Sequence, residues 1–534
     1  MKINSIPITE RSNPKSINID VLKETAIPKV LSDCEDEIFG GYNNFDGIYD
    51  KKLLNSYESF VSKIQMSLKN GIEVNVILLG SGTSGRLCRL MAKILNPLLD
   101  HKINLIPIIA GGIKALVRAE PNTEDKTETG ISDYLSHTTN LDRSNCFVIG
   151  VTCGLSANYV KGALDEANKY SKGKTAIIGF NPFELATINL GKDIQVFNPI
   201  IGPEAIVGSV RMKGGTATMI LIYALLVSSI KPPGHIKDDL IDIFNNCQKT
   251  LTTIRHYQPF ITKLIRSGSQ TLSAGGSIYL LGLSDYYGDL CIYDAAECPP
   301  TFGAKLQQVN GYSRQGISNL AYFPGEVNEI LAKEIDFNLF IKNNLSHLTK
   351  NDMIVVFSDA GKNIREISRL SRLKLINFFP IIISSKGFTS KNNFISVEND
   401  WQGDFCKQLF VRSMLVNIST GTFILSGKVY KNKMIDLRIT NKKLFLRSLR
   451  IINDITLKNE TTIKKALLKN IYDGAPSLSN SLEEHIALSS TRENIVPQTI
   501  LSLVYPETSV EKLKTMLINE PTIRKLIIKQ MTNI

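Results

Sequence analysis

The amino-acid sequence predicts an α/β protein with two doubly wound parallel sheets in tandem and a separate all-α domain at its C-terminal end. The chain has 534 residues, too many for one ordinary core. Short β-branched runs that end in glycine alternate with amphipathic stretches in two successive blocks, and after Gly427 only helical patterns follow. Continuous apolar strands that alternate with helices are typical of parallel sheets buried on both faces.

The first half of the chain divides into an arm and one α/β block. Residues 1–45 contain prolines and a weak periodicity, which predict a partly helical arm. The first block then covers residues 46–250. Amphipathic stretches separate most of its expected strands, which are Val74–Gly80, Asn104–Gly111, Cys146–Cys153, Lys174–Asn181 and Gln195–Asn198.

The second block, residues 251–426, has the pattern of a diverged copy of the first. A helical segment that begins at "KPPGH", Lys231–His235, marks the boundary between the two. The expected strands of the second block are Ser277–Leu283, Met353–Ser358, Pro380–Ser385 and Asn393–Val397. Residues 427–534 are expected to form helices without strands.

Composition excludes several classes of protein. The eight cysteines occur singly, without a C-x-x-C pair and without a metal-type arrangement with the six histidines, so we expect a reducing compartment and no metal site. The N-terminus lacks the apolar region of a signal peptide, and the longest apolar run, Ala217–Ile230, is short enough to be a buried helix. The net charge of +12 comes without any nucleic-acid-binding motif, so we expect neither nucleic acid nor membrane as a partner.

The stretch "GSGTSGR" lies between the first strand and an amphipathic run. Its glycines allow close approach of the backbone, and Gly82, Thr83, Ser84 and Gly85 would offer N–H and hydroxyl groups to an anion. The G-K-[ST] ending of a nucleotide P-loop is missing. A dinucleotide site or a plain tight turn stays an alternative, although no acidic residue ends the next strand. We interpret the stretch as a cradle for a phosphomonoester.

A second polar turn, "TCGLSA", follows the third strand with Thr152, Gly154 and Ser156. Parallel sheets bind ligands beyond the carboxyl ends of their strands, so the two turns are expected to converge on one ligand.

Three stretches, "LLGSGTSGRL", "IIAGGIKALVRAEPNTED" and "NPIIGPEAIVGSVRMKGGTAT", resemble the hallmarks of sugar isomerase (SIS) domains. They are most similar to the branch that contains the bacterial N-acetylmuramic acid 6-phosphate etherases and the animal glucokinase regulatory proteins. An etherase has one SIS domain, whereas this chain has two blocks and a helical tail, whose segment Gly427–Leu449 resembles the start of a regulator's lid. The resemblance implies two flavodoxin-like SIS domains and a C-terminal lid.

The resemblance also implies roles for single residues. Glu124, in "TED", matches the acidic residue that faces the sugar hydroxyls, and Lys443, in "TNKKL", matches a lid lysine that reaches the bound phosphosugar. The family's etherases use two glutamates as acid and base. This chain keeps one as Glu124 and has Ile94 at the position of the other, so the first block is expected to bind without catalysing.

The second block keeps the other glutamate, Glu297, in "DAAECPPTFG". Its own glycine loop is longer and carries Asp285, Tyr286 and Tyr287, which disfavour a phosphate. We expect Glu297 to be a structural remnant at the interface of the two blocks. An etherase-like lyase or an isomerase that uses Glu124 with Glu297 stays the alternative.

Other charged residues have structural interpretations. Arg86 is expected either to cap a backbone group or to form a structural ion pair. Arg211 and Lys213 are expected to form ion pairs at a helix start, with phosphate binding as their alternative. Glu204 would either contact ligand or fix a turn.

The resemblance therefore implies a regulator that binds fructose 6-phosphate or fructose 1-phosphate in the first SIS domain and needs no cofactor. It also implies that this regulator inhibits a glucokinase or hexokinase in the cytoplasm or nucleus. The segment by which animal regulators grip glucokinase is not recognisable near Asn392–Gln408.

Overall fold

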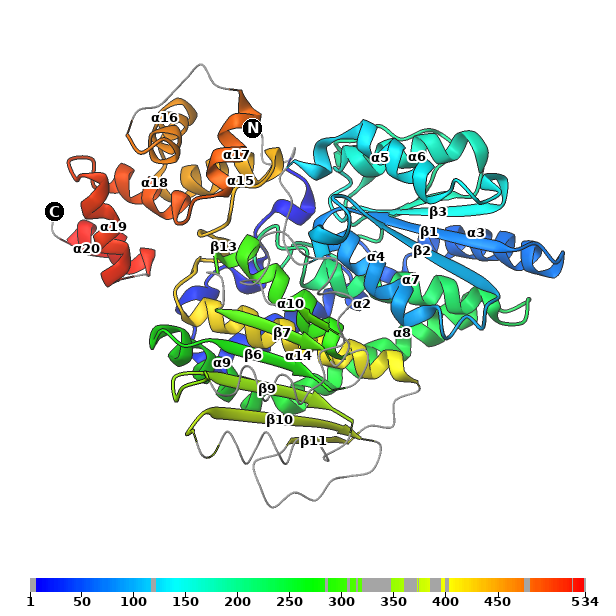
Figure 1. The fold of residues 1–534 in the computed structure, drawn as a ribbon, viewed down its shortest axis with the longest axis horizontal. Coiled ribbons are helices and arrows are strands. Elements are labelled where there is room, and N and C mark those ends of the chain that lie inside the picture. The colour runs from blue at the N-terminus through cyan, green and yellow to red at the C-terminus, as the bar shows by residue number, and fades with distance from the viewer. Residues whose placement is uncertain are drawn as a thin grey trace.

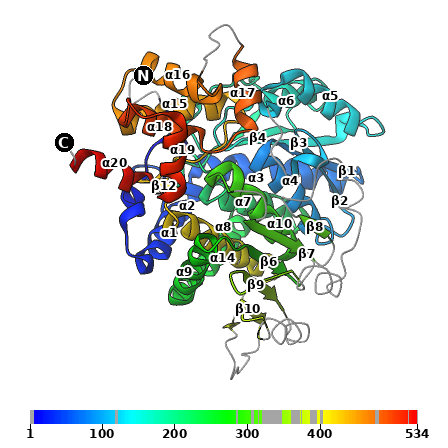
Figure 2. The same cartoon turned by 60° about the vertical axis from the view of Figure 1, so that its left-hand side comes forward.

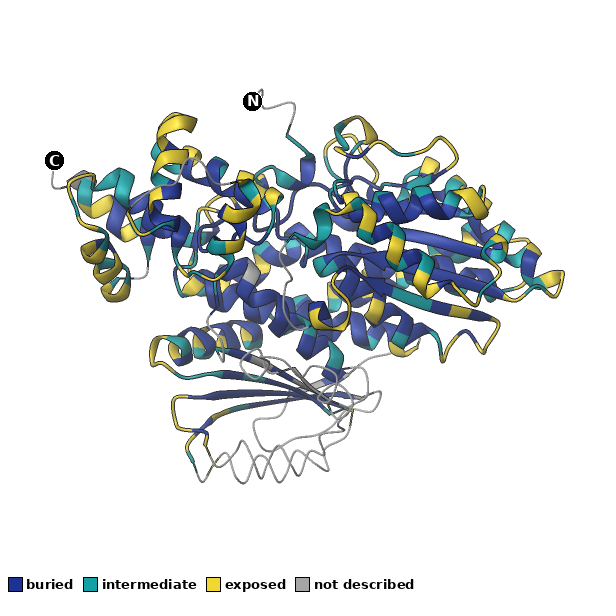
Figure 3. Cartoon of the chain, turned by 45° about the horizontal axis from the view of Figure 1, so that its top comes forward, coloured by how far each residue is buried: buried dark blue, intermediate teal, exposed yellow. Residues whose placement is uncertain are grey.

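The chain contains one parallel sheet and one sheet that is parallel except for an edge strand, and a helical domain lies beside the two domains that hold them (Figure 1). The computed structural model describes residues 6–116, 122–283, 287–304, 308–313, 316–318, 347–359, 372, 374–384, 395–398, 403–474, 481–520 and 522–532. Buried residues fill the sheets and the helices between them, whereas the outer faces of the helices are exposed (Figure 3).

The first sheet has the order β2-β1-β3-β4-β5 with all strands parallel. Its strands are β1 Val74–Gly80, β2 Ile103–Ile109, β3 Cys146–Val151, β4 Thr175–Ile178 and β5 Gln195–Phe197. This order is the flavodoxin-like one, in which the chain moves to opposite sides of β1 and leaves a crevice at its carboxyl end. The predicted fold class is confirmed, and the expected strands extend beyond the observed ones by a few residues at most.

Helices cover both faces of the first sheet. The side chains of β1 alternate, so that Val76 and Leu78 join the core under one set of helices and Ile77 and Leu79 join the core under the other. The first set is α3 Lys51–Lys69, α4 Gly82–Leu95 and α7 Lys213–Ile230, and the second is α5 Thr127–His137 and α6 Asn158–Tyr170. Helix α7 is long and apolar enough to cross a membrane, but 83% of its apolar window is buried inside the protein, as expected for a core helix.

The second sheet repeats the strand order of the first and adds one strand. Its order is β11-β10-β9-β6-β7-β8, so β6 lies between β7 and β9 as β1 lies between β2 and β3. Strand β8 is antiparallel to β7 and extends the edge. The strands are β6 Ile278–Gly282, β7 Val309–Ser313, β8 Gly316–Ser318, β9 Met353–Ser358, β10 Asn377–Ser384 and β11 Ile395–Glu398. We did not predict β7 and β8 because they are short and carry glycine and polar residues in place of an apolar run.

Four helices occupy the space around the junction of the two sheets: α8 Ile236–Thr253, α9 Gln258–Ser273, α10 Tyr287–Phe302 and α14 Asp404–Leu425. Helix α14 packs against α8, α9 and α10, and nearly all of its side chains are buried. Helix α10 also contacts α4 of the first domain.

The C-terminal domain is helical, with one correction to the sequence prediction. Its helices are α15 Lys442–Thr456, α16 Glu460–Ile471, α17 Leu482–Ser490, α18 Ile495–Val504, α19 Val510–Asn519 and α20 Ile523–Thr532. A two-stranded antiparallel hairpin, β12 Val429–Tyr430 and β13 Lys433–Met434, precedes them, although no strand was expected there. Strands of two residues leave no periodicity in a sequence.

The N-terminal arm is built into the fold more deeply than its weak periodicity suggests. It contains helices α1 Ile27–Glu35 and α2 Glu37–Gly40 and passes next to the helical domain (Figure 2). The Thr9 N–H donates to Asn181 Oδ1 at 3.0 Å, and Arg524 of α20 forms an ion pair with Asp20 at 2.7 Å. The arm therefore joins the first sheet to the far end of the helical domain.

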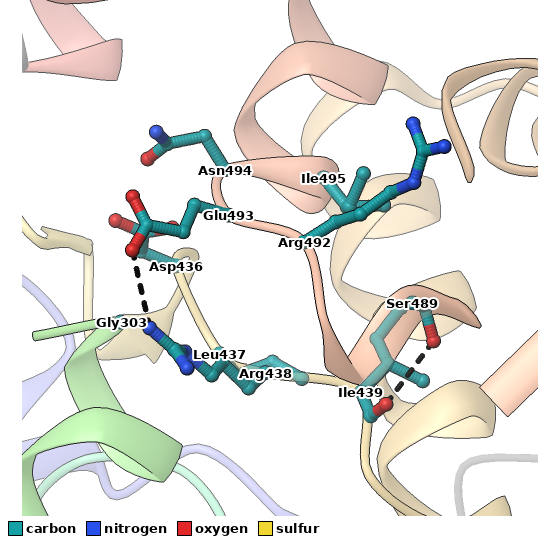
Figure 4. A pocket seen from close by; sticks show the side chains of 10 residues that line it. All are labelled: Gly303, Asp436, Leu437, Arg438, Ile439, Ser489, Arg492, Glu493, Asn494 and Ile495. Carbon is teal, nitrogen blue, oxygen red and sulfur yellow. Dashed lines mark hydrogen bonds and ion pairs between the residues drawn. The ribbon is translucent and has the colours of Figure 1, made fainter. Parts of the chain in front are cut away.

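A small pocket lies at the seam between the second domain and the helical domain (Figure 4). The seam encloses a cavity of about 10 Å³ lined by Gly303 and by residues of the helical domain such as Asp436 and Asn494. Lys428 Nζ lies 2.6 Å from Asp436, and burial raises the pKa of that carboxyl. A cavity of this size holds no more than a water molecule, so this seam is a contact surface and not a ligand site.

Candidate functional site

The glycine loop forms a tight connection between β1 and α4. A Cβ atom on Gly80 would lie 2.8 Å from the Gly85 nitrogen, and one on Gly85 would lie 2.6 Å from the Gly80 oxygen. Gly82 has a positive φ of 52°, and nothing lies within 4 Å of the position of its Cβ. The N-cap Ser81 makes no side-chain capping bond, so the first N–H groups of α4 are left for an anion.

Two of the hydroxyl groups of the loop, those of Thr83 and Ser84, lie near different neighbours. Ser84 is buried, and its Oγ lies 3.7 Å from Cys153 Sγ in the second polar turn. Thr83 donates a hydrogen bond of 2.8 Å to Glu297 Oε2 of the second domain. Ser84 therefore faces the second turn, and Thr83 faces the domain interface.

The second polar turn lies beside the loop because Gly80 pairs with Val151 in the parallel register of β1 and β3. Thr152 Oγ1 accepts hydrogen bonds from the N–H groups of Ser156 at 3.3 Å and Ala157 at 3.4 Å, and it thereby fixes the turn. The Gly154 carbonyl accepts a bond of 3.0 Å from Asn181. The sheet thus brings Gly154 and Ser156 to the same edge as the glycine loop, while the Thr152 hydroxyl already has partners.

The helical domain reaches the first domain at the turn that carries Glu124. Lys443 Nζ, near the start of α15, lies 3.3 Å from Glu124 Oε2. The Asn122 N–H donates to the Thr440 carbonyl at 3.0 Å, and the Lys442 N–H donates to Asp125 at 3.4 Å. Glu124 and Lys443, singled out separately in the sequence, are 319 positions apart and meet in the structure.

Asn441 holds the start of α15, because its side chain accepts a hydrogen bond of 2.8 Å from the Leu444 N–H. We expect Asn441→Ala to lower the free energy of unfolding by about 1 kcal/mol, as the loss of an N-cap does. Urea denaturation measures this change. Asn441→Ser should restore most of the stability, and Lys442→Ala, at an exposed position next to it, should have little effect. Equal losses in all three variants would contradict the capping role.

Glu297 belongs to the second domain, but its carboxylate contacts residues of the first domain. Its Oε1 lies 2.6 Å from Arg86 Nη1, and the two side chains are only 10% and 3% exposed. The expected structural ion pair of Arg86 is confirmed, and its partner is the glutamate that we expected to be an interface remnant. Because Thr83 also donates to Glu297, this carboxylate contacts the first turn of α4. Ile94, in contrast, lies in the hydrophobic core with 1% of its surface exposed.

The charged residues of the run "GPEAIVGSVRMKGG" have structural roles. Glu204 accepts hydrogen bonds from the Lys213 and Gly214 N–H groups at 3.0 and 2.7 Å, so it caps α7, and burial raises its pKa to about 7. Lys213 Nζ contacts Glu37 at 2.5 Å, and Arg211 forms an ion pair with Asp294 at 2.9 Å. These interactions favour the turn-fixing and ion-pair interpretations.

The loop of the second domain begins like that of the first, since a Cβ on Gly282 would lie 2.0 Å from the Gly288 nitrogen. Tyr287, at the start of α10, is buried and donates to Asp359 at 2.7 Å. Asp285 and Tyr286, which we expected to disfavour phosphate, lie outside the described residues. Within the described part of the chain, no group of three or more His, Cys, Asp or Glu side chains could hold a metal ion.

Three family models match successive parts of the chain. They are the glucokinase regulatory protein N-terminal SIS domain at residues 59–168, the second SIS domain of that protein at residues 257–377, and its C-terminal lid domain at residues 431–527. The chain belongs to the glucokinase regulatory protein-like family. The resemblance identified from the motifs is therefore confirmed, together with the two SIS domains and the C-terminal lid.

Full-length relatives agree with the family models. The chain is 26% identical to the glucokinase regulatory protein of Xenopus laevis over 556 residues and 28% identical to that of Homo sapiens over 562 residues, which covers 94% of this chain and 89% of each relative. It is 32% identical to the N-acetylmuramic acid 6-phosphate etherase of Photorhabdus laumondii over 244 residues, but this covers only 45% of the chain and 75% of the etherase. The etherase likeness is thus partial.

Proposed function

We propose that the chain is a phosphosugar-sensing regulatory protein. It holds fructose 6-phosphate or fructose 1-phosphate in the first SIS domain and inhibits a glucokinase or hexokinase. The observation that carries this proposal is the contact between Lys443 of the lid and Glu124 of the first SIS domain at 3.3 Å. Lys443 also acts electrostatically on Cys153, which lies 3.7 Å from Ser84 in the uncapped first turn of α4. A cation from one domain beside an anion-binding turn of another suits a sensor that reports occupancy.

Each part of the site takes one part of the ligand. The N–H groups of Gly82, Thr83 and Ser84 hold the phosphate, supported by the Ser84 hydroxyl. The Gly85 N–H bonds to the Ser81 carbonyl and the Thr83 hydroxyl bonds to Glu297. Gly154 and Ser156 form the second wall of the site, next to Thr152, whose hydroxyl already accepts hydrogen bonds from the turn. Glu124 accepts hydrogen bonds from the sugar hydroxyls, and Lys443 contacts the ligand from the lid.

Sensing requires that the ligand bind one lid arrangement more tightly than another. Without ligand, Lys443 pairs with Glu124; a bound phosphate competes for the same ammonium group, so occupancy changes what holds the lid to the first domain. The surface that contacts the kinase changes when the lid moves relative to the first domain. Within Asn392–Gln408, where the sequence lacks a recognisable kinase-binding segment, residues 392–394 and 399–402 lie outside the described residues.

We expect Ser84→Ala to weaken fructose phosphate binding by about 1–2 kcal/mol through the loss of one hydrogen bond to the phosphate. Isothermal titration calorimetry measures the change. Ser67→Ala, which removes a serine hydroxyl bonded within α3, is the matched control and should leave the affinity unchanged. An unchanged affinity in Ser84→Ala would mean that the phosphate does not lie at this loop.

The function is tested by a pulldown of the organism's own sugar kinase, with and without fructose 6-phosphate and fructose 1-phosphate, coupled to a kinase activity assay. We expect binding and inhibition that change with the ligand. Absence of any ligand-dependent binding or inhibition would overturn the regulator proposal.

A second candidate, an etherase-like lyase, is favoured by one observation: Glu297 contacts Thr83 of the glycine loop at 2.8 Å, so Glu124 and Glu297 both belong to the surroundings of the first-domain site. Two carboxylates in different environments can act as acid and base in an elimination that removes an α-proton and expels lactate. Incubation with N-acetylmuramic acid 6-phosphate, followed by a lactate assay, tests it. Turnover that Glu297→Gln abolishes would replace the regulator proposal.

A further inference from the structure

A cavity of about 30 Å³ lies where α4 of the first SIS domain meets α10 and α14 of the second. Its walls are mostly leucine, valine and tyrosine side chains from these three helices. Its polar lining includes three arginines and two carboxylates, which are Arg86, Arg211, Arg412, Asp294 and Glu297. All five charged side chains belong to buried residues, with between 2% and 8% of their surface exposed.

The charges in this lining do not balance. Arg86 pairs with Glu297 at 2.6 Å, and Arg211 pairs with Asp294 at 2.9 Å. Arg412 has no carboxylate within 4.0 Å among the residues that the structure describes, and its Nη2 donates to the backbone oxygen of Arg211 at 2.7 Å. A buried guanidinium without a counter-charge is unfavourable, and burial lowers the pKa of Arg412 accordingly.

Besides Asp294 and Glu297 of the lining, Glu35 interacts electrostatically with Arg412. It offsets the positive charge of Arg412 poorly. Its carboxylate accepts hydrogen bonds from Ser413 at 2.6 Å and from Thr216 at 2.7 Å. Burial raises the pKa of Glu35, and Glu35 does not line the cavity. The excess positive charge therefore stays in the cavity lining.

Several polar atoms of the lining also lack hydrogen-bond partners. Arg86 Nη2 and Arg211 Nε are buried donors, and Asp294 Oδ2 is a buried acceptor, without a partner in the described parts of the chain. Buried polar groups in folded proteins are nearly always satisfied by protein, water or a bound ion. Because the Arg86 and Arg211 donors lie beside the unpaired Arg412 guanidinium, a negatively charged acceptor would satisfy both the hydrogen bonding and the charge.

We propose that this cavity binds a small, weakly hydrated monovalent anion, such as chloride or bromide. The volume is about twice the 10–15 Å³ that a water molecule needs, so it accommodates one halide and one water that donates to Asp294. The mostly apolar walls disfavour strongly hydrated anions, and a phosphate ester is too large. The site adjoins the phosphate cradle without coinciding with it, because Thr83 lines this cavity whereas Gly82, Ser84 and Gly85 do not.

Such an anion would stabilise the contact between the two SIS domains, because the arginines that surround it come from both. We expect the unfolding temperature of the full-length protein to rise by roughly 2 °C, and to saturate, as sodium methanesulfonate is replaced by sodium bromide at constant ionic strength. Methanesulfonate is too large for the cavity. Arg412→Met should abolish the rise, whereas Lys407→Met, on the first turn of the same helix, should keep it.

Crystals grown in bromide locate the ion by its anomalous scattering, and this measurement needs no variant. An anomalous peak beside Arg412 supports the proposal. A peak only at the Gly82–Gly85 turn, no peak at all, or an equal bromide effect in Arg412→Met would overturn it. These outcomes do not depend on whether the chain binds a phosphosugar.

Discussion

Glu297→Ala is expected to lower the free energy of unfolding by about 3–5 kcal/mol, because it leaves the Arg86 guanidinium buried without its counter-charge. The Thr83 hydroxyl loses its acceptor in the same variant. Chemical denaturation monitored by circular dichroism and by size-exclusion chromatography measures the loss and shows whether the two SIS domains separate.

Two controls test the cause of that loss. Glu58→Ala removes one partner of an exposed ion pair with Lys237 and should cost no more than about 1 kcal/mol. Replacing Arg86 and Glu297 together by methionine removes both charges, so the double variant should be more stable than Glu297→Ala. A loss below about 1 kcal/mol in Glu297→Ala would contradict a structural role for the pair.

The same residue connects the two candidate functions. Glu297 is held by Arg86 and Thr83, which suits a carboxylate that ties the domains together. An acid or base that takes part in elimination must exchange a proton with substrate, whereas Glu297 already accepts from Arg86 Nη1 at 2.6 Å and from the Thr83 hydroxyl at 2.8 Å. This arrangement favours the structural role over the role of a proton donor.

The fold could be predicted because its signals are local. The buried run Val74–Gly80 and the glycines that follow it indicate a strand, a turn and a helix without any distant information. Glu124 and Lys443 can each be singled out as site residues, because each lies in a short stretch that resembles a family motif, but the sequence does not show that the two meet.

What could not be predicted depends on contacts between distant segments. The bond from Thr83 to Glu297 joins residues 214 positions apart, and nothing near either residue indicates the other. The arm presents a similar case: Asn13 donates to Glu37 and to the Pro203 carbonyl, both at 2.9 Å, but a polar residue among prolines gives no periodic signal. The unpaired charge of Arg412 is visible only once α14 is packed against α4 and α10.

The lid lysine gives the sharpest test of the sensing proposal. We expect Lys443→Ala to weaken the binding of fructose phosphate about 10- to 100-fold, because a hydrogen bond from a charged donor contributes about 1.5–3 kcal/mol. The fold should persist, since the side chain is 36% exposed and its contact with Glu124 is a partly solvated ion pair. Calorimetry with fructose 6-phosphate and fructose 1-phosphate measures the affinity, and thermal unfolding measures the stability.

Variants at neighbouring positions separate charge from general damage. Lys442→Ala removes an exposed lysine one position earlier and should bind normally, whereas Lys443→Arg keeps the charge and should retain part of the affinity. If Lys443→Ala binds as tightly as the unaltered protein, the lid lysine does not contact the ligand. If the unaltered protein binds neither sugar phosphate, the ligand assignment itself fails. If affinity falls while kinase inhibition no longer responds to ligand, the lid transmits occupancy of the first SIS domain to the kinase, as the contact between Glu124 and Lys443 leads us to expect.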